Sequence, residues 1–370
     1  MSSLHDAIEQ PVAPRRGRLV GALAVYREAG LGEVARRLYS RARAYAQIRH
    51  YEYNLRRLYL PLERIPIDRP IFLLGVQGGG GTLMARTLYR HPRAVYAGGN
   101  ARFWAGIDEI HNCQHTIRDL PEELIHRSAQ FRNLDGRLEC HPVYGYQRYW
   151  LYAIDELLPR YRRTAEQANP DSSERLRRVV RKVIRAYAPD PQAARFVDMS
   201  QLYTIQAGYV AELLRGTNPR FILLSRNPYA TCARAVVKEY DVRGTRRTLS
   251  RAERVRCAVE HWDNSLRTAL ADCEARSLPM LHVRYEDFLD DPESVVRRMS
   301  EFAELEFDPR QVPGPGQKIP LGSEAGEKWY PLRRSENQRY LDEAGGPDLI
   351  RALNERSADL IARLGYSVLG

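Results

Sequence analysis

The chain has 370 residues, of which 44% are hydrophobic and 28% charged, as in an ordered globular protein. No apolar run approaches the roughly 20 residues that a membrane-spanning helix needs, and five widely spaced cysteines are unlike the disulfide framework of a small secreted domain. The net charge of +11 suits an anionic ligand, nucleic acid or an anionic membrane, and we expect a cytoplasmic protein whose thiols are reduced.

Residues 1–65 are predicted to form an N-terminal helical extension. From about residue 16 to 60, apolar side chains recur at helical spacing with arginines between them; they are Leu31, Val34, Leu38, Tyr45, Ile48, Leu55 and Leu58. Such an amphipathic helix either packs on the main domain or meets a membrane or partner surface. Peripheral membrane association through this helix therefore stays open.

Five short apolar runs separated by helical patterns predict an α/β domain over residues 66–310. The runs are IFLLG from residue 71, AVYA from 94, RFVDM from 195, RFILLS from 220 and MLHVRY from 280. This alternation favours a parallel β-sheet flanked by helices, with ligands at the carboxyl ends of the strands.

Two further segments accompany this domain. A mostly helical insertion is expected from about 111 to 192, and its stretch SERLRRVVRKVIRAY has a basic face that is either solvated surface or a grip for an acidic substrate. Residues 311–370 begin with a Gly- and Pro-rich stretch and are predicted to form a C-terminal loop and helix that close the domain.

The stretch GVQGGGGTLMARTL at residues 75–88 places four consecutive glycines between an apolar run and a helical pattern. Backbone N–H groups at such a strand-to-helix turn favour an anion. Gly75, Gly80 and Thr82 fit the phosphate-loop template G-x-x-x-x-G-K-[ST], except that Gly81 stands at the lysine position. Because that lysine meets the nucleotide phosphates in kinases and NTPases, its absence argues against ordinary ATP chemistry. A tight connection without a ligand is the alternative.

A second stretch, FILLSRNPYATCARAVVKEY from residue 221, predicts another strand followed by a helix. Arg226 stands at the end of the strand, and Asn227 suits the N-cap of the helix. Thr231 and Arg234 share a helix face with Asn227, which makes Arg226 and Arg234 a candidate clamp for a second phosphate. The alternative is that these arginines pair with surface carboxylates.

A third stretch, LHVRYEDFLDDPESVVRRMSEF from residue 281, leads from a strand through a turn into an amphipathic helix. Together with the glycine turn, SRNPYATCARA, HW at 261–262 and LGY at 364–366, it resembles the sulfotransferases, most closely their bacterial, tyrosylprotein and carbohydrate branches. The resemblance covers about residues 68 to 305. It implies a P-loop nucleoside-triphosphate-hydrolase-like fold and the use of 3′-phosphoadenosine 5′-phosphosulfate as sulfuryl donor, without a metal ion.

The resemblance also implies a division of labour in the nucleotide site. The backbone amides of the loop and the Thr82 hydroxyl would hold the 5′-phosphosulfate; the loop residues are Gly78, Gly79, Gly80, Gly81, Thr82 and Leu83. Arg226 would hold the 3′-phosphate, with Arg234 standing where many members have serine. Tyr285 matches the tyrosine of the family's YED segment and would belong to the nucleotide site, with packing under the nucleotide as the alternative. Lys328 and Trp329 resemble a C-terminal loop that closes over the nucleotide in some branches.

The catalytic part departs from the family pattern. Many members carry Arg or Lys where this chain has Gly78, and Lys where it has Met199, whereas Ser200 still matches a family hydroxyl. The glutamate base of many members falls at Gly99 or Asn100. Candidate replacements are Arg102 for the cation and Asp108, Glu109 or His111 for the base. A metal site built on His111, Cys113 and His115 is disfavoured because no second matching pair of ligands accompanies them.

The whole sequence predicts a sulfotransferase that transfers a sulfuryl group to a hydroxyl of a carbohydrate, glycolipid or other small metabolite. The positive charge suits an acidic acceptor, and the aromatic segment 141–158 either stacks on the acceptor or packs in the core. Because both family cations are missing, a catalytically degenerate binding protein stays open, as does a nucleotide kinase or other NTPase of related fold. A nucleic-acid partner is not expected, since no helix-turn-helix or zinc finger is recognisable.

Overall fold

The computed structural model of the chain describes residues 59–101, 103–104, 109–112, 117, 119–125, 151–237, 249–313, 319–320, 329–330 and 335–370, and residues 31, 32, 35 and 39 of the N-terminal region. The predicted N-terminal extension lies almost wholly outside these residues, as do Cys113 and Cys140. Cys232, Cys257 and Cys273 are buried free thiols. No helix in the described ranges combines the length and the apolar character needed to cross a membrane. The domain boundaries drawn from the sequence stay predictions.

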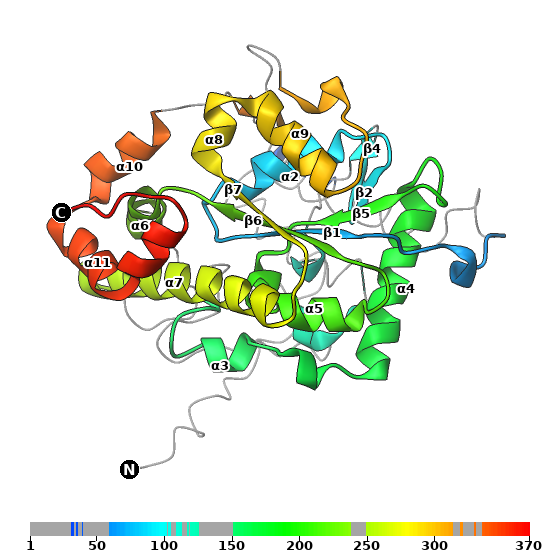
Figure 1. Cartoon of the computed structure of the whole chain (residues 1–370), viewed down its shortest axis with the longest axis horizontal. Helices are drawn as coiled ribbons and strands as arrows, with labels where there is room; N and C mark the ends of the chain where they lie inside the picture. The colour runs from blue at the N-terminus through cyan, green and yellow to red at the C-terminus, as the bar shows by residue number, and fades with distance from the viewer. Residues whose placement is uncertain are drawn as a thin grey trace.

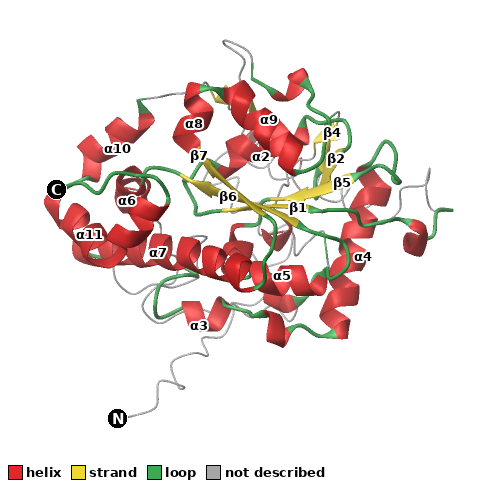
Figure 2. Ribbon diagram, in the orientation of Figure 1, coloured by secondary structure: helices red, strands yellow, loops and turns green. Residues whose placement is uncertain are grey.

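Within the described residues, a seven-stranded sheet lies at the centre of the protein, in the order β4-β3-β2-β5-β1-β6-β7 (Figures 1 and 2). The strands are β1 (Ile71–Leu74), β2 (Ala94–Tyr96), β3 (Gly99–Asn100), β4 (Phe103–Trp104), β5 (Arg195–Asp198), β6 (Arg220–Ser225) and β7 (Met280–Arg284). β2, β5, β1, β6 and β7 run parallel, and they coincide with the apolar runs of the sequence. The predicted α/β fold with a parallel sheet is confirmed. β3 and β4 add an antiparallel hairpin that the sequence analysis missed, because each contributes only two residues.

Helices cover both faces of this sheet. α2 (Gly81–Tyr89), α8 (Tyr285–Asp290) and α9 (Pro292–Phe302) lie on one face, whereas α4 (Pro170–Tyr187), α5 (Ala207–Leu213) and α7 (Arg251–Ala275) lie on the other (Figure 1). α6 (Pro228–Val237), α10 (Glu336–Ala344) and α11 (Pro347–Arg363) gather at one end of the molecule, and the short α3 (Leu158–Tyr161) lies outside α7. The chain is thus a three-layered α/β protein.

The two layers of core follow from the alternation of side chains along the strands. Ile71 and Leu73 of β1 belong to a cluster with residues of α2 and α9, whereas Phe72 and Leu74 belong to a larger cluster with residues of α4, α5 and α7. Because both faces are covered, β1 is apolar throughout, and its neighbours β5 and β6 are apolar between their end residues. A ligand can therefore bind at the ends of the strands and at the loops that follow them, because the faces of the sheet are covered.

The start of α6 is fixed by a side-chain cap. The Asn227 Oδ1 atom accepts a hydrogen bond from the Ala230 backbone N–H at 3.0 Å, as its position after β6 predicts. Pro228 is the first residue of the helix, where its missing N–H costs nothing. The cap fixes the direction in which the preceding residue, Arg226, leaves the sheet.

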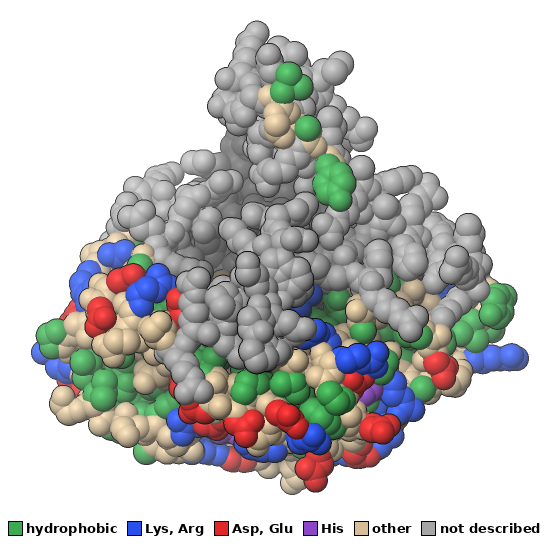
Figure 3. All heavy atoms as spheres, turned by 90° about the horizontal axis from the view of Figure 1, so that it is seen from above, with side chains coloured by type: hydrophobic (Ala, Val, Ile, Leu, Met, Phe, Trp, Pro, Cys, Tyr) green, Lys and Arg blue, Asp and Glu red, His purple; other side chains and the backbone are tan. Residues whose placement is uncertain are grey.

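The basic face of α4 holds neighbouring segments of the protein. Arg177 donates to the carbonyl oxygen of Leu213 at 3.2 Å, and Lys182 forms an ion pair with Asp119 at 2.6 Å. These contacts give the basic residues of α4 a structural role that needs no acidic substrate. Over the described part of the face seen in Figure 3, basic and acidic side chains alternate, and this view shows no broad basic field there.

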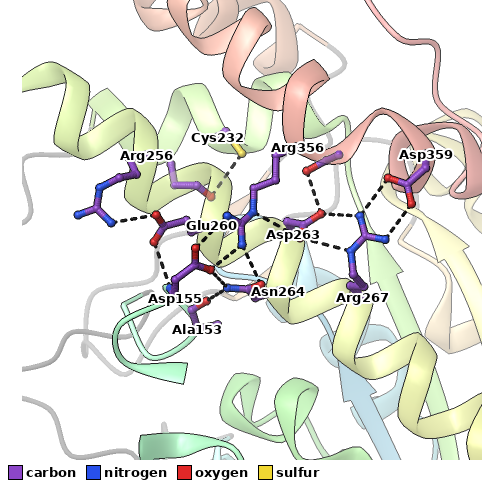
Figure 4. A network of polar contacts seen from close by, with 12 residues as sticks. Ala153, Asp155, Cys232, Arg256, Glu260, Asp263, Asn264, Arg267, Arg356 and Asp359 are labelled. Carbon is purple, nitrogen blue, oxygen red and sulfur yellow. Dashed lines mark hydrogen bonds and ion pairs between the residues drawn. The ribbon is translucent and has the colours of Figure 1, made fainter. Parts of the chain in front are cut away.

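A polar network ties α11 to α7 (Figure 4). The carboxylate of Asp263 accepts hydrogen bonds from Arg267 and from the Ser357 hydroxyl, both at 2.9 Å. Arg356 of α11 donates to Asp155 at 2.9 Å, and the backbone N–H of Asp155 donates to Glu260 of α7 at 3.1 Å. This network anchors the C-terminal helix whose neighbour, α10, reaches the site described next.

Candidate functional site

The glycine loop begins where β1 ends. Gly75 has a φ of 152°, and a Cβ at this position would lie 2.8 Å from the carbonyl oxygen of Leu224 in β6. The Thr204 hydroxyl accepts from the Gly75 N–H at 2.8 Å and donates to the Gly75 carbonyl at 3.0 Å. Residue 75 must therefore be glycine, and the first turn of the loop is held against two other segments of the sheet edge.

The loop then turns directly into α2. Gly78 and Gly80 have φ angles of 92° and 91°, a region that glycine adopts at little cost. Gly80 is the N-cap, and its carbonyl accepts from the Leu83 N–H at 3.0 Å, so the buried Leu83 begins the hydrogen-bond ladder of the helix. The amides of Gly81 and Thr82 precede this ladder and have no acceptor within the helix. They form the anion-favouring end of a nine-residue helix.

Arg226 lies against the loop although it is 148 residues further along the chain than Gly78. Its Nη1 donates to the Gly78 carbonyl at 3.1 Å, and its Nε donates to Asn337 Oδ1 at 2.7 Å. The side chain is only 6% exposed, and its buried Nη2 has no hydrogen-bond partner in the described part of the chain. Burial lowers the pKa of Arg226 from its usual value, but a guanidinium stays charged in proteins. Because a buried charge is costly unless it is paired, the Arg226 guanidinium favours the binding of an anion beside it.

Two tyrosines surround the arginine. The Arg226 guanidinium carbon lies 4.7 Å from the ring centroid of Tyr285 and 5.7 Å from that of Tyr340. A Cβ on Gly80 would overlap the Tyr285 ring at Cδ2 and lie 2.9 Å from Cε2, so Tyr285 packs directly against the loop. Arg234 stacks on Tyr340 as well, at 5.8 Å. The structure thus brings the loop, Arg226, Arg234 and Tyr285 together, as the resemblance implies.

Glu286 connects this cluster to the C-terminal region. Its Oε1 accepts from the Asn227 backbone N–H at 2.9 Å and from Asn337 Nδ2 at 2.7 Å, and its Oε2 accepts from the Tyr366 hydroxyl at 2.9 Å. The carboxylate therefore orients Asn337, which in turn orients Arg226. Sequence analysis missed Glu286, Asn337 and Tyr340, although Glu286 directly follows Tyr285 in the YED stretch.

The carboxyl end of β5 carries the second part of the site. The carboxylate of Asp198 is fully buried and accepts the backbone N–H groups of Ile110 at 3.0 Å and Ser200 at 2.9 Å. Burial raises the pKa of Asp198 to about 7, against the opposing effect of these two donors. The Ser200 hydroxyl accepts the His111 N–H at 3.1 Å. Asp198 and Ser200 together fix the segment that carries Glu109 and His111. Asp198 is another residue that the sequence analysis missed.

His111 is a buried, neutral imidazole. Its Nδ1 accepts from the Leu202 N–H at 3.3 Å, so Nε2 carries the proton and donates to Glu109 Oε2 at 2.9 Å. Burial lowers the pKa of His111 to about 3. The Glu109 side chain, in contrast, is 15% exposed. Of these two candidates for the base, Glu109 is the more exposed.

The two parts of the site adjoin each other through Met199. This side chain is 2% exposed, and a Cβ on Gly81 would lie 3.9 Å from its terminal methyl carbon. Met199 and Gln201 also line a cavity of about 10 Å³ beneath the loop, which is about the space of one water molecule. A larger open cavity of about 470 Å³ lies elsewhere, at the start of α5, and its lining includes Glu123 and Tyr209 but no residue of the loop.

Several candidates lie outside the described residues: Arg102, Asp108, Cys113, His115 and Lys328. For Trp329 the structure describes only the backbone, which pairs with Pro320 in a two-residue antiparallel ribbon, β8 (Ile319–Pro320) with β9 (Trp329–Tyr330). In the part of the chain that is described, no group of three His, Cys, Asp or Glu residues is arranged to hold a metal ion.

Comparison with known proteins gives one family. A family model described as the sulfotransferase family matches residues 70–309, a range that contains both the glycine loop and Arg226. No curated protein sequence matches the chain significantly.

Solved structures with a similar course of the chain are also sulfotransferases. The sulfotransferase domain from the curacin biosynthetic pathway is 15% identical, with a TM-score of 0.47 over 82% of this chain and 100% of that one. Sulfotransferase STF9 from Mycobacterium avium is 14% identical, with a TM-score of 0.46 over 84% and 80%. A sulfotransferase from Alicyclobacillus acidocaldarius is 17% identical, with a TM-score of 0.41 over 81% and 98%.

Proposed function

Because the chain belongs to the sulfotransferase family, we propose that it transfers a sulfuryl group from 3′-phosphoadenosine 5′-phosphosulfate to a hydroxyl group of a carbohydrate, glycolipid or other small metabolite. The observation that carries the proposal is the contact between Arg226 and Gly78. It joins two anion-binding elements, a helix N-terminus and a buried guanidinium, in one place. A nucleotide with phosphate groups at both the 5′ and 3′ positions needs two such elements.

The donor nucleotide fits the chemistry of these residues. The amides of Gly81 and Thr82 suit the 5′-phosphosulfate. The Nη2 of Arg226, which has no partner in the described ranges, suits the 3′-phosphate. Tyr285 and Tyr340 offer aromatic faces beside the arginine. Gly81 in place of a lysine disfavours a nucleotide kinase, whose lysine would meet the terminal phosphates.

Glu109 is the proposed general base. A sulfuryl acceptor must lose its hydroxyl proton as its oxygen attacks sulfur. His111 cannot take this proton, because one ring nitrogen already accepts the Leu202 N–H and the other carries a hydrogen. Its N–H holds the Glu109 carboxylate in place instead. Asp198 and Ser200 accept hydrogen bonds from the backbone N–H groups of Ile110 and His111, and they thereby fix the segment that carries Glu109.

Binding of adenosine 3′,5′-bisphosphate tests the nucleotide site. We expect a saturable calorimetric signal with the wild-type protein, and binding about 10- to 100-fold weaker with Arg226→Gln, which removes a charge-assisted contact. Arg297→Gln is the control, because Arg297 is an exposed residue of α9 that pairs with Glu293. Absence of binding by the folded wild-type protein, or equal binding by both variants, would refute the proposed site.

Turnover separates an enzyme from a protein that only binds the nucleotide. The ³⁵S-labelled donor is incubated with the protein and an extract of host metabolites, and labelled products are separated by chromatography. We expect a labelled product that Glu109→Gln reduces about 100-fold or more, the usual range for loss of a general base. Nucleotide binding without any labelled product would favour the binding protein.

A further inference from the structure

The glycine loop carries no cation of its own. Residues 75–83 read GVQGGGGTL, and the neighbouring Met199 presents a methyl group to Gly81. The proposed reaction nevertheless needs positive charge at this place. When the bond from sulfur to the bridging oxygen breaks, negative charge develops on that oxygen, and a preorganised cation would stabilise it.

Arg234 lies on the apex of the loop. A Cβ built on Gly78 would overlap Nη1 of Arg234 and lie 3.4 Å from its Cδ. The arginine side chain therefore occupies the space into which any side chain of residue 78 would project. Gly78 also has a φ of 92°, so both its backbone and its surroundings demand glycine.

We propose that Arg234 supplies, from helix α6, the positive charge that the loop lacks, and that it acts on the 5′ end of the donor rather than on the 3′-phosphate. The inference rests on the proposed function and assigns Arg234 a different task from the one that the family resemblance implies. A guanidinium in contact with residue 78 can reach an anion held by the amides of the residues that follow.

The surroundings of the two arginines differ in a way that fits separate tasks. Arg226 is held from two directions, by the Gly78 carbonyl and by Asn337, and its Nη2 has no hydrogen-bond partner among the residues that the structure describes. Arg234 is half-buried, and its buried Nε has no partner among the described residues. Tyr340 contacts both guanidinium groups, at 5.7 and 5.8 Å. Two like charges on one ring repel each other, and an anion bound at each would relieve the repulsion.

The transfer step balances without a further reactant. The acceptor oxygen forms a bond to sulfur, and its proton passes to the Glu109 carboxylate. The bond between sulfur and the bridging oxygen breaks, and its electron pair stays on that oxygen, which leaves as part of adenosine 3′,5′-bisphosphate. Arg234 pairs with the charge on this oxygen. Sulfur keeps its oxidation state throughout.

Three nucleotides test which end of the donor Arg234 serves. Adenosine 3′,5′-bisphosphate, adenosine 5′-monophosphate and adenosine 3′-monophosphate are titrated into wild type and Arg234→Ser by competition with a fluorescent nucleotide. We expect the variant to bind the bisphosphate and the 5′-monophosphate about 10- to 100-fold more weakly, and the 3′-monophosphate as wild type does. Loss confined to the bisphosphate and the 3′-monophosphate would overturn the inference while leaving the proposed function intact. Failure of wild type to bind any of them would refute the proposed function itself.

A charge transplant provides a second test. Gly78→Arg alone forces two arginines into one space and should abolish binding of the 5′-monophosphate. In the double variant Gly78→Arg/Arg234→Ser the overlap of side chains is removed and only the backbone strain of the positive φ of residue 78 remains. We still expect at least about tenfold tighter binding than in Arg234→Ser. Arg339→Ser is the matched control, because Arg339 contacts the same Tyr340 ring at 4.5 Å but is largely exposed and pairs with Glu336. A double variant that is folded at the temperature of the titration, as circular dichroism would show, and that binds no better than Arg234→Ser would count against Arg234 acting at the loop.

Discussion

Replacement of Gly80 by alanine should damage the loop more than its backbone angle alone explains. Gly80 has a φ of 91°, which costs an L-residue about 1–2 kcal/mol. The added methyl group would also overlap Tyr285 and lie 2.9 Å from Cε2. Moving a packed ring costs a further amount of about 1–3 kcal/mol. We therefore expect Gly80→Ala to lower the free energy of unfolding by about 2–5 kcal/mol.

Gly216→Ala is the matched control for this experiment. Gly216 has a similar φ of 85°, but a Cβ there would have no neighbour within 4 Å. This variant should lose only about 1–2 kcal/mol and should bind adenosine 3′,5′-bisphosphate as wild type does, whereas Gly80→Ala should bind it poorly. Urea unfolding measures the stabilities, and calorimetry measures the binding. Equal losses of stability in the two variants would show that Tyr285 does not pack against the loop, and the account of the site would fail with it.

Three further outcomes can be measured. In Asp198→Asn one of the two backbone donors loses its acceptor, so urea unfolding should show a loss of about 1–3 kcal/mol; an unchanged stability would contradict the buried pairing. Because the folded protein keeps His111 neutral while the unfolded chain takes up a proton below about pH 6.5, wild type should lose about 2 kcal/mol more than His111→Asn between pH 7 and pH 5. Parallel stability curves would contradict this. Asn337→Ala should weaken binding of adenosine 3′,5′-bisphosphate about 5- to 30-fold by freeing Arg226 Nε, whereas the exposed Gln338→Ala on the same helix should not; equal effects would remove Asn337 from the site.

The sequence predicts best those features that depend on residues close together in the chain, such as turns and helix caps. The glycine turn lies between an apolar strand and a helix, and Arg226 stands between another strand and the cap of α6. In a parallel sheet the carboxyl ends of neighbouring strands lie at one edge. Local patterns and sheet topology together therefore suffice to bring the loop near Arg226, since β1 and β6 are adjacent.

What the sequence does not predict depends on contacts between distant segments. Asn337 lies 111 residues after Arg226, and nothing in the polar stretch around it marks it as a neighbour of the loop. Asp198 carried a usable signal, namely a carboxylate that directly follows the apolar pair Phe196 and Val197, at the edge where ligands bind. The choice between Glu109 and His111 as the base could not be made from the sequence, because it depends on which of the two side chains is buried.

The structure gives a second reason for glycine at positions 78 and 80 of the loop. A phosphate-binding turn explains glycine where backbone amides must approach an anion, but here Gly78 and Gly80 also face side chains from other elements, Arg234 of α6 and Tyr285 of α8. Gly78 leaves room for the Arg234 side chain, and Gly80 leaves room for the Tyr285 ring. A loop without cations is then no sign of lost chemistry, because charge can reach the same place from a neighbouring helix. The activity of this family member therefore depends on the side chains that neighbouring helices pack against the loop, and not only on the residues within the loop.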